Sequence, residues 1–546
     1  MDDSTASATK FNGKADPPNA NGSMASGLIN GNGDAVAKLN HYTASNGNGH
    51  LPKTNGHTAS VNLANGKTEL KKSTIETNGH RDLDASHVLH NSLVDIPPTV
   101  VSASGSYIHL STGQRILDGC TGAAVSIIGH GGPSVQAAVV EQMSKICYTH
   151  TVAFTTPVAE ELANTILEGN PYGLARAFFV CSGSEAMDSA LKLARQYYVE
   201  IKQPQRTHIV ARHRSYHGNT VGALSVSSHV GRRAPFKNAL ILDNVSYVSA
   251  TYPYRGQLEA ETEAGYSARL VKELDGEFQS VGPENVMAFV AEPVGGATAG
   301  CITAPPGYYQ GVRRLCDKYG ILLILDEVMC GSGRTGTYFA FEQEGPGVYP
   351  DLITMGKGLG GGYAPMGAVL AHEKVIRGFQ GGSAYFVHSH TYQAHAMSCA
   401  AALAVQQVLR RDNLVARCAA MGKWLESALQ SRLGTRKFVG NIRGRGLFWG
   451  SEFVKDKAAK EPFDPSLRFT WKIVDEAQRR GLAVYPGSGT VDGAKGDHII
   501  VAPPYNMLDE EFEKLIRILE ETYNVVEKEV DEMLRISSRK AEYWCG

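Results

Sequence analysis

The sequence predicts an α/β fold, with a large domain built on a mostly parallel sheet covered by helices on both faces, plus a smaller α+β domain. Short, continuously apolar segments alternate with amphipathic segments through the middle of the chain. Continuous apolar runs are typical of strands buried on both faces, as in parallel sheets. Strands are expected over 177–181, 207–211, 286–292 and 321–326, and helices over 185–200 and 307–319.

The smaller domain is expected to combine segments from both ends of the folded region. A hairpin over 107–118 and a helix over 134–145 come first, and helices over 396–411, 414–433 and 509–534 with strands over 446–453 and 498–502 come last. The expected division is therefore an N-terminal part of the small domain over 86–145, a large domain over 146–395 and a C-terminal part of the small domain over 396–546.

Residues 1–85 differ in composition from the rest of the chain. Asn-Gly pairs recur among Ser, Thr, Ala and Lys, with almost no large apolar residues. Such a segment cannot bury enough surface to offset its ordering entropy, so a disordered extension is predicted. It has neither the apolar stretch of a signal peptide nor the arginine-rich character of a transit peptide.

Charge and cysteine usage exclude several classes of function. The 53 basic and 54 acidic residues give a net charge of -1, which argues against nucleic acid as a partner. No apolar run approaches the roughly 18–20 residues that a membrane span requires. The nine cysteines are scattered and never in CxxC spacing, so neither a disulfide framework nor a metal site is expected. A cytoplasmic location is predicted.

The stretch DLITMGKGLGGG at 351–362 delivers one lysine, Lys357, from a buried strand into a run of glycines. One interpretation is a cation paired with a neighbouring carboxylate. The other is an amine in a desolvated site, neutral often enough to attack a carbonyl. Glycines favour the second interpretation because they let the backbone pass close to a flat ligand.

Other strand ends supply further candidates, since ligands bind beyond the carboxyl ends of parallel strands. Asp326 and Glu292 each follow an apolar strand, where a carboxylate is costly unless a cation pairs with it. Gly183 and Ser184 open a helix whose free N–H groups could hold an anion, although an ordinary helix cap is the simpler interpretation. Tyr216, in the loop after another strand, could stack on a planar ligand or could serve packing alone.

A glycine motif at 331–336 matches GxGxxG but is a poor candidate for a dinucleotide site. Such a site needs the glycines directly after a strand and at the start of a helix. Here Asp326 and Glu327 intervene, where they would repel a pyrophosphate, and the sequence after Gly336 does not resemble a helix start.

Taken together, these sequence motifs resemble those of the class III aminotransferases, which are fold type I pyridoxal-phosphate (PLP) enzymes. The resemblance covers about 90 to 530, and its motifs occur in family order: CSGSEAMDSALKLAR, SYHG, AEPVGG, LLILDEVMCGSGRTG, DLITMGKGLGGGYAPMG, HTYQAH, RGRGLFWG and VAPP.

The resemblance implies a role for each matching residue. Lys357 would form the Schiff base with PLP, and Asp326 would pair with the pyridine nitrogen and keep the ring an electron sink. The residues that would contact the cofactor elsewhere are Gly183 and Ser184 at the phosphate, Tyr216 on the ring and Thr391 at the phosphate of the neighbouring subunit in a homodimer. Glu292 and His217 would lie behind them.

The activity that the resemblance implies is ping-pong transfer of an amino group from an amine or (ω-)amino acid to a keto acid, aldehyde or ketone. Two alternatives stay open, namely another PLP reaction on the same fold (decarboxylase, racemase or aminomutase) and a catalytically silent binding protein.

The chain departs from part of the family at Met329, Ala297 and Ile500. In place of Met329, many members carry a glutamine that hydrogen-bonds to the hydroxyl group of the cofactor ring. In place of Ala297, some carry a gating glutamate, and in place of Ile500 the same members carry an arginine that binds the substrate carboxylate. Without that arginine, a carboxylate should be poorly held there unless Lys495, Arg443 or Arg445 substitutes for it. An uncharged or long-chain amine is therefore expected as substrate, with pyruvate or alanine preferred over glutamate.

Overall fold

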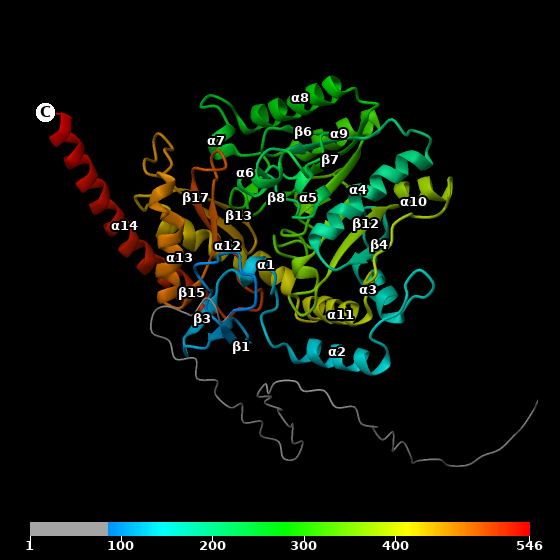
Figure 1. The fold of residues 1–546 in the computed structure, drawn as a ribbon, viewed down its shortest axis with the longest axis horizontal. Coiled ribbons are helices and arrows are strands. Elements are labelled where there is room, and N and C mark those ends of the chain that lie inside the picture. The colour runs from blue at the N-terminus through cyan, green and yellow to red at the C-terminus, as the bar shows by residue number, and fades with distance from the viewer. Residues whose placement is uncertain (1–85, 546) are drawn as a thin grey trace, which may run out of the picture. The chain divides into compact units, whose positions relative to one another are not determined.

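A seven-stranded sheet forms the centre of the computed structural model, which describes residues 86–545. The predicted disordered extension, 1–85, lies outside the described residues. In spatial order the strands are β4 (Leu174–Val180), β12 (Gly367–His372), β11 (Leu352–Met355), β10 (Leu322–Asp326), β7 (Val286–Ala291), β5 (His208–Arg212) and β6 (Val245–Val248). Strands β4, β12, β7 and β6 are labelled in Figure 1. Only β12 runs antiparallel to its neighbours in this sheet.

Both faces of this sheet are buried, as the continuous apolar strands predict. Side chains alternate along each strand, so that in β10 Leu323 and Leu325 face one core and Leu322 and Ile324 the other. One face is covered by α3 (Pro157–Leu167), α8 (Glu263–Val281), α9 (Tyr308–Tyr319) and part of α11 (Ala396–Arg411). The other is covered by α4 (Gly183–Glu200), α5 (Val221–Val226) and α10 (Glu373–Gln380). The mostly parallel α/β fold is confirmed.

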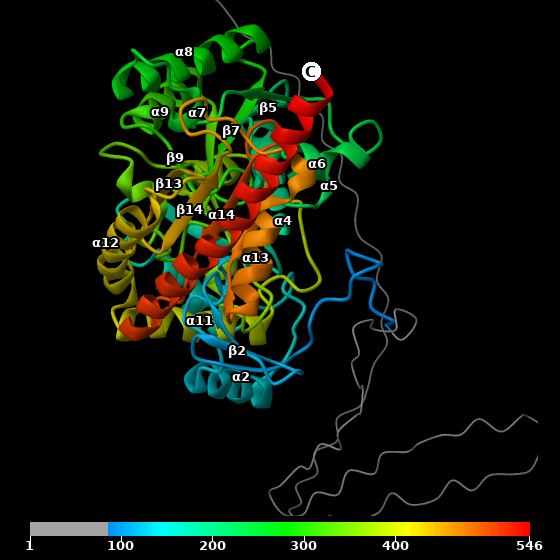
Figure 2. The ribbon, with the colours of Figure 1, turned by 90° about the vertical axis from the view of Figure 1, so that its left-hand side faces the viewer.

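A second, antiparallel sheet belongs to the C-terminal part of the chain. Its strands in spatial order are β13 (Val439–Arg445), β14 (Phe448–Phe453), β17 (Asp497–Val501) and β16 (Tyr485–Ser488). The helices that pack with it are α12 (Leu414–Leu433), α13 (Phe469–Arg479) and α14 (Asp509–Cys545). Helices α13 and α14 run side by side (Figure 2). Helix α14 extends well beyond the predicted end at Leu534.

Segments from the two ends of the folded chain meet in a third sheet. It comprises β1 (Val100–Ser104), β2 (Tyr107–Leu110), β3 (Arg115–Asp118) and β15 (Leu482–Ala483). Strand β15 pairs in parallel with β3, which joins the N-terminal hairpin to the C-terminal part as expected. Helix α2 (Pro133–Lys145) packs on α11.

The remaining elements are short. They are α1 (Thr121–Ala124), α6 (Val230–Arg233), α7 (Pro253–Gly256), the strand pair β8 (Val294–Gly295) and β9 (Ile302–Thr303), and the 3-10 turns η2 (Ala234–Phe236), η3 (Ala340–Gln343), η4 (Lys357–Leu359) and η5 (Pro465–Leu467). Over residues 86–545, no helix combines the length and apolarity needed to cross a membrane.

Candidate active site

Three predicted residues come together at the carboxyl edge of the central sheet. In the parallel pairing of β10 with β11, Asp326 lies opposite Thr354, three residues before Lys357. In the pairing of β10 with β7, Leu325 lies opposite Ala291, so Glu292 follows in register with Asp326. Parallel strands end at a common edge, and this brings the amine and both carboxylates close together.

Lys357 occupies a strained turn directly after β11. Its φ of 44° lies in the left-handed region, which non-glycine residues seldom adopt and which clusters at functional sites. Burial lowers the pKa of the Lys357 amine, and the charges of Asp326 and Glu292 oppose this shift only in part. A lowered pKa favours the neutral form of the amine, which is the nucleophilic form.

The turn of Lys357 packs tightly against the start of helix α4. A Cβ at Gly356 would lie 3.2 Å from Cγ1 of Val328 and 3.4 Å from Cα of Gly183. A Cβ at Gly183 would come within 2.6 Å of the same Val328 methyl group. The glycines predicted to allow close backbone approach are therefore needed for two loops to meet here.

Asp326 is a buried carboxylate held by a histidine and a backbone N–H group. Its Oδ2 lies 2.8 Å from Nδ1 of His217, and its Oδ1 accepts a hydrogen bond of 3.0 Å from the N–H of Val328. No lysine or arginine forms an ion pair with it within the described part of the chain. Nε2 of His217 is buried and has no hydrogen-bond partner among the same residues. The carboxylate can therefore accept a further cationic donor.

Glu292 ties two loops of the site together. Its Oε2 accepts from the N–H of Tyr216 at 3.3 Å, and its Oε1 accepts from the N–H of Gly296 at 3.0 Å. Burial raises the pKa of the Glu292 carboxyl, and the nearby charge of Asp326 adds to this. Glu292 thus acts on the site through the backbone positions it fixes.

The first turn of α4 carries Gly183 and Ser184, which are predicted to form an anion cradle. Ser182 caps the helix by accepting from the N–H of Glu185 at 3.2 Å, so the N–H groups of Gly183 and Ser184 remain at the open end. The Ser184 hydroxyl donates to Oδ1 of Asn219 at 3.0 Å and accepts from the Asn219 N–H at 3.1 Å. Asn219 links the cradle to the SYHG loop, and the sequence argument missed it.

Tyr216 presents its ring beside two basic residues that the sequence argument also missed. The Arg232 guanidinium carbon lies 4.4 Å from the ring centroid, and the His229 ring meets Tyr216 edge-on with centroids 6.4 Å apart. The positive charge of Arg232 also helps to lower the pKa of Lys357. Both residues belong to α6 and its cap, a short helix that no sequence signal identified.

Thr391 lies apart from these residues on the exposed surface. The preceding residue, His390, contacts Oε1 of Glu185 at 3.1 Å, and this places Thr391 beside the first turn of α4. Cys181, Glu185 and His390 also bring potential metal ligands within 4.8 Å of one another. The other oxygen of Glu185 accepts from the Cys181 N–H at 2.8 Å, so hydrogen bonds account for this cluster.

The three family departures share one apolar cluster. Met329 and the fully buried Ile500 pack together with Phe448 and Cys301, and the half-buried Ala297 lies against them. Of the three cations considered as substitutes, two are already paired. Arg443 contacts Glu452 at 2.7 Å and Arg445 contacts Glu344 at 2.5 Å.

The GxGxxG stretch is a turn and not a nucleotide loop. It leads into η3, and Glu327 accepts from the N–H groups of Ala340 and Phe341 at 2.7 and 2.9 Å. Arg334 is buried and donates to the carbonyl oxygens of Leu447 and Pro503. The motif therefore holds the chain together, as the argument against a dinucleotide predicts.

These features fit a planar, phosphorylated aldehyde cofactor. The amine of Lys357 has no hydrogen bond or ion pair within the described residues, and Asp326 lacks a permanent cation. A protonated ring nitrogen would supply that cation, and the N–H groups at the start of α4 would hold a phosphate. Such an arrangement is that of a fold type I PLP enzyme.

The chain belongs to the class III aminotransferase family. The model of that family, aminotransferase class-III, matches residues 90–523. An aminotransferase of Gibberella zeae is 44% identical over 455 residues, which cover 83% of this chain and 88% of that protein. An uncharacterized aminotransferase of Schizosaccharomyces pombe is 45% identical over 453 residues, covering 83% and 98%.

A solved structure agrees with these relatives. A thermostable (S)-enantioselective omega-transaminase from Thermomicrobium roseum superposes with a TM-score of 0.75 at 33% identity, covering 82% of this chain and 97% of that one. The protein is therefore a PLP-dependent transaminase, which acts on an amino donor and a carbonyl acceptor.

Proposed function

We propose that Lys357 and Asp326 are the catalytic residues of this transaminase. The proposal depends on one observation, which is that the two residues lie together at one edge of the sheet. Burial lowers the pKa of the Lys357 amine, and no lysine or arginine of the described residues pairs with the Asp326 carboxylate. Gly183 and Ser184 would bind the cofactor phosphate through the N–H groups of α4, and Tyr216 would stack on the ring. Glu292 and His217 would position Tyr216 and Asp326.

PLP supplies an aldehyde that bonds to amines and a ring that withdraws electrons from the adjacent carbon. The residues of this chain supply the rest. Lys357 would hold the cofactor through its Nζ, and the same atom would carry a proton during the reaction. Asp326 would keep the ring nitrogen protonated, and the N–H of His217 would hold that carboxylate in position.

We propose that the amino donor presents an amine at the end of a chain. The apolar cluster of Met329, Ala297 and Ile500 supports this, because a carboxylate beside the amine would meet no cation there. The relation to solved omega-transaminases supports the same substrate class. Pyruvate is proposed as acceptor in preference to 2-oxoglutarate.

A donor panel tests the proposal. Terminal amines, ω-amino acids and α-amino acids should be compared by kcat/KM with pyruvate and 2-oxoglutarate. Terminal amines with pyruvate should rank first. If glutamate is the best donor, and Ile500→Arg leaves its kcat/KM unchanged, the proposed pocket is wrong.

We further propose that the enzyme is a homodimer with shared active sites. Apolar side chains gather near Thr391, and those with large exposed fractions are Tyr392 (55%), Tyr148 (43%), Val152 (55%) and Phe154 (66%). The rings of Tyr148 and Tyr392 also contact each other, with centroids 6.0 Å apart. Covering this surface with a second subunit would bring Thr391 to the neighbouring phosphate. The cytoplasmic location stays a prediction, which cell fractionation can test.

The predicted domain division is proposed as well. One hydrophobic core joins residues of the N-terminal hairpin with residues from 401 to 530, separately from the two cores that flank the central sheet. Helix α11 contributes to both kinds of core, with Val405 on one side and Cys399 on the other. The proposed domain boundary near residue 396 would therefore lie at the start of a helix that packs in both domains.

A further inference from the structure

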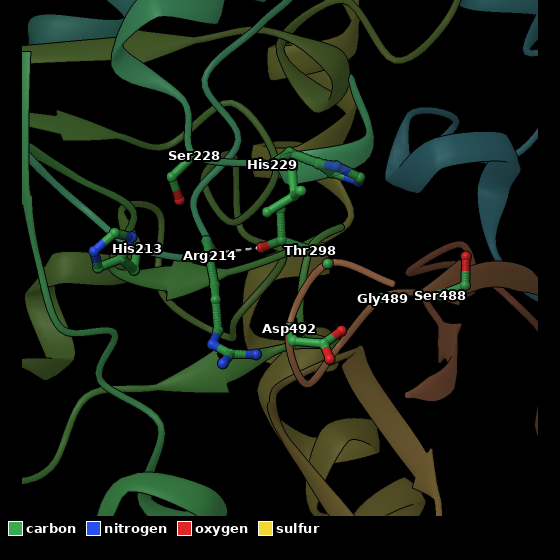
Figure 3. A pocket seen from close by; sticks show the side chains of 10 residues that line it. His213, Arg214, Ser228, His229, Thr298, Ser488, Gly489 and Asp492 are labelled. Atoms are coloured by element: carbon green, nitrogen blue, oxygen red, sulfur yellow. Dashed lines mark hydrogen bonds between the residues drawn. The ribbon is translucent and has the colours of Figure 1, made fainter. Parts of the chain in front are cut away.

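A cavity of about 130 Å³ lies between the loop that follows strand β5, the start of helix α6 and the loop that follows strand β16 (Figure 3). Three segments that are distant in the sequence line it. They contribute Arg214, His229, Thr298, Ser488, Gly489 and Asp492, and we call this cavity the Arg214 pocket. Its volume accommodates a small polar group with several atoms of chain, because a single water needs at least ~10–15 Å³ of such space.

Arg214 brings a positive charge into this pocket without a close carboxylate partner. Its Nη1 donates to the carbonyl oxygen of Thr490, and its guanidinium carbon lies 5.8 Å from the ring centroid of Tyr252. Within residues 86–545 no carboxylate oxygen comes within 4.0 Å of the guanidinium, and no hydrogen bond uses Nε or Nη2. Burial lowers the pKa of Arg214, as expected of a half-buried cation that lacks an ion pair.

The backbone holds Arg214 in this position. Its φ of 59° lies in the left-handed region, which is uncommon for a residue with a long side chain. The hydroxyl of Thr298 donates to the Arg214 carbonyl oxygen (Figure 3). A strained residue tethered in this way points to a function that needs its side chain in one place.

Asp492 and His229 are the other titratable side chains of the pocket, apart from the exposed His213 on its rim. In Figure 3 the carboxylate of Asp492 is turned away from the Arg214 guanidinium, and its Oδ1 accepts from the N–H groups of Ala494 and Lys495 at 2.8 and 2.7 Å. Its charge therefore serves a turn of the loop and reaches Arg214 only at longer range. The guanidinium retains two nitrogens for a ligand.

The pocket is linked to residues of the candidate active site by one ring contact and by adjacency in the chain. Arg214 stands two residues before Tyr216, and the ring of His229 contacts the ring of Tyr216. Thr298 directly follows Ala297 of the apolar cluster. The pocket therefore borders both Tyr216 and the apolar cluster.

We propose that the Arg214 pocket binds the carboxylate at the far end of an ω-amino acid whose amine reaches Lys357. This inference rests on the proposed function, since it assigns the second end of the terminal-amine donor. Arginine suits the task because its planar fork donates two parallel hydrogen bonds to a carboxylate. The sequence argument kept ω-amino acids among the donors but did not consider Arg214 as the cation for their carboxylate.

Paired donors test the inference in the full-length holoenzyme. The ω-amino acids with three to six carbons are compared with the n-alkylamines of equal length, with pyruvate as acceptor. Arg214→Met should lower kcat/KM for the best ω-amino acid at least 20-fold and change that for the matched alkylamine less than twofold. Arg214→Lys should recover part of the loss, because it keeps the charge.

Binding of hexanoate, which has the carboxylate but no amine, gives a readout independent of turnover. Hexanoate should compete with the ω-amino acid, and Arg214→Met should weaken its binding at least tenfold by calorimetry. Lys495→Met, which removes an exposed cation from the same loop, is the matched control and should leave binding unchanged. Asp492→Asn keeps an oxygen that can accept the hydrogen bonds of the loop but removes the negative charge near Arg214. Hexanoate, which is an anion, should therefore bind more tightly to this variant.

Three results would overturn the inference. They are equal effects of Arg214→Met on both members of a donor pair, hexanoate binding that does not depend on Arg214, and a loss caused by Lys495→Met instead. In each case terminal amines can still be good donors, so the proposed function stands. If no terminal amine is a donor, the proposed function fails with it.

Discussion

His217 donates from Nδ1 to the carboxylate of Asp326 across 2.8 Å, in a position where the histidine side chain is fully buried. The two residues are separated by 109 positions in the sequence and come from neighbouring parts of the sheet edge. The histidine holds Oδ2 and the N–H of Val328 holds Oδ1, and the carboxylate keeps further lone pairs for a protonated ring nitrogen. This pair explains how a buried carboxylate is held ready for a cationic partner.

We expect substitution of Asp326 to lower turnover more than substitution of His217. Asp326→Asn keeps the shape but removes the charge that holds a proton on the ring, so kcat should fall on the order of 10²–10³-fold. His217→Phe removes one hydrogen bond to a charged group, worth ~1.5–3 kcal/mol, and should cost roughly 10–100-fold. Steady-state kinetics and melting temperature should be measured together. Equal losses in both variants, with a large drop in melting temperature, would indicate a structural role only.

Thr391 makes a prediction for the subunit interface. If its hydroxyl reaches the neighbouring phosphate, Thr391→Val should weaken cofactor binding by ~1.5–3 kcal/mol, and Thr391→Ser should retain it. Cofactor should also stabilise the dimer by mass action. Equilibrium dialysis and sedimentation measure the two effects. A fully active monomer would contradict the shared site.

His498 makes a prediction for acid stability. Burial, with help from the charge of Arg443, lowers the pKa of this histidine from 6.5 to about 3. Between these two pH values the unfolded chain binds a proton that the folded chain does not, so stability falls as the pH falls below 6.5. The slope from this residue is up to ~1.4 kcal/mol per pH unit.

Melting curves between pH 7.5 and 5 measure this effect. His498→Gln should flatten the pH dependence, while the exposed His87→Gln should leave it as in the parent enzyme. A variant of His498 with the same acid sensitivity as the parent would show that other groups control it.

The positions of the candidate site residues that lie at strand ends could be predicted from the sequence alone. Asp326 and Glu292 follow apolar strands, and Lys357 follows another, so the geometry of a parallel sheet places them at one edge. The mostly parallel α/β fold was predictable for the same reason, since continuous apolar runs identify strands buried on both faces. Helix ends were less predictable, and α14 continues past Leu534 because nothing in the sequence stops it there.

The parts that were not predictable depend on contacts between distant segments. Arg214 lines a pocket only because the loop that contains Asp492 lies next to it in the fold, and no local sequence pattern predicts that contact. The antiparallel strand β12 was missed because Gly367–His372 follows a glycine-rich turn and carries no directional signal. Arg443 and Arg445 seemed free in the sequence, but Glu452 and Glu344 pair with them in the fold.

The most direct test of the account is to find which lysine holds the cofactor. The holoenzyme is reduced with borohydride, digested, and its cofactor-labelled peptide is sequenced by mass spectrometry. The label should lie on Lys357, and Lys357→Ala should lose both the label and turnover while the phosphate cradle still binds cofactor reversibly. A label on any other lysine, or turnover that survives in Lys357→Ala, would contradict the account.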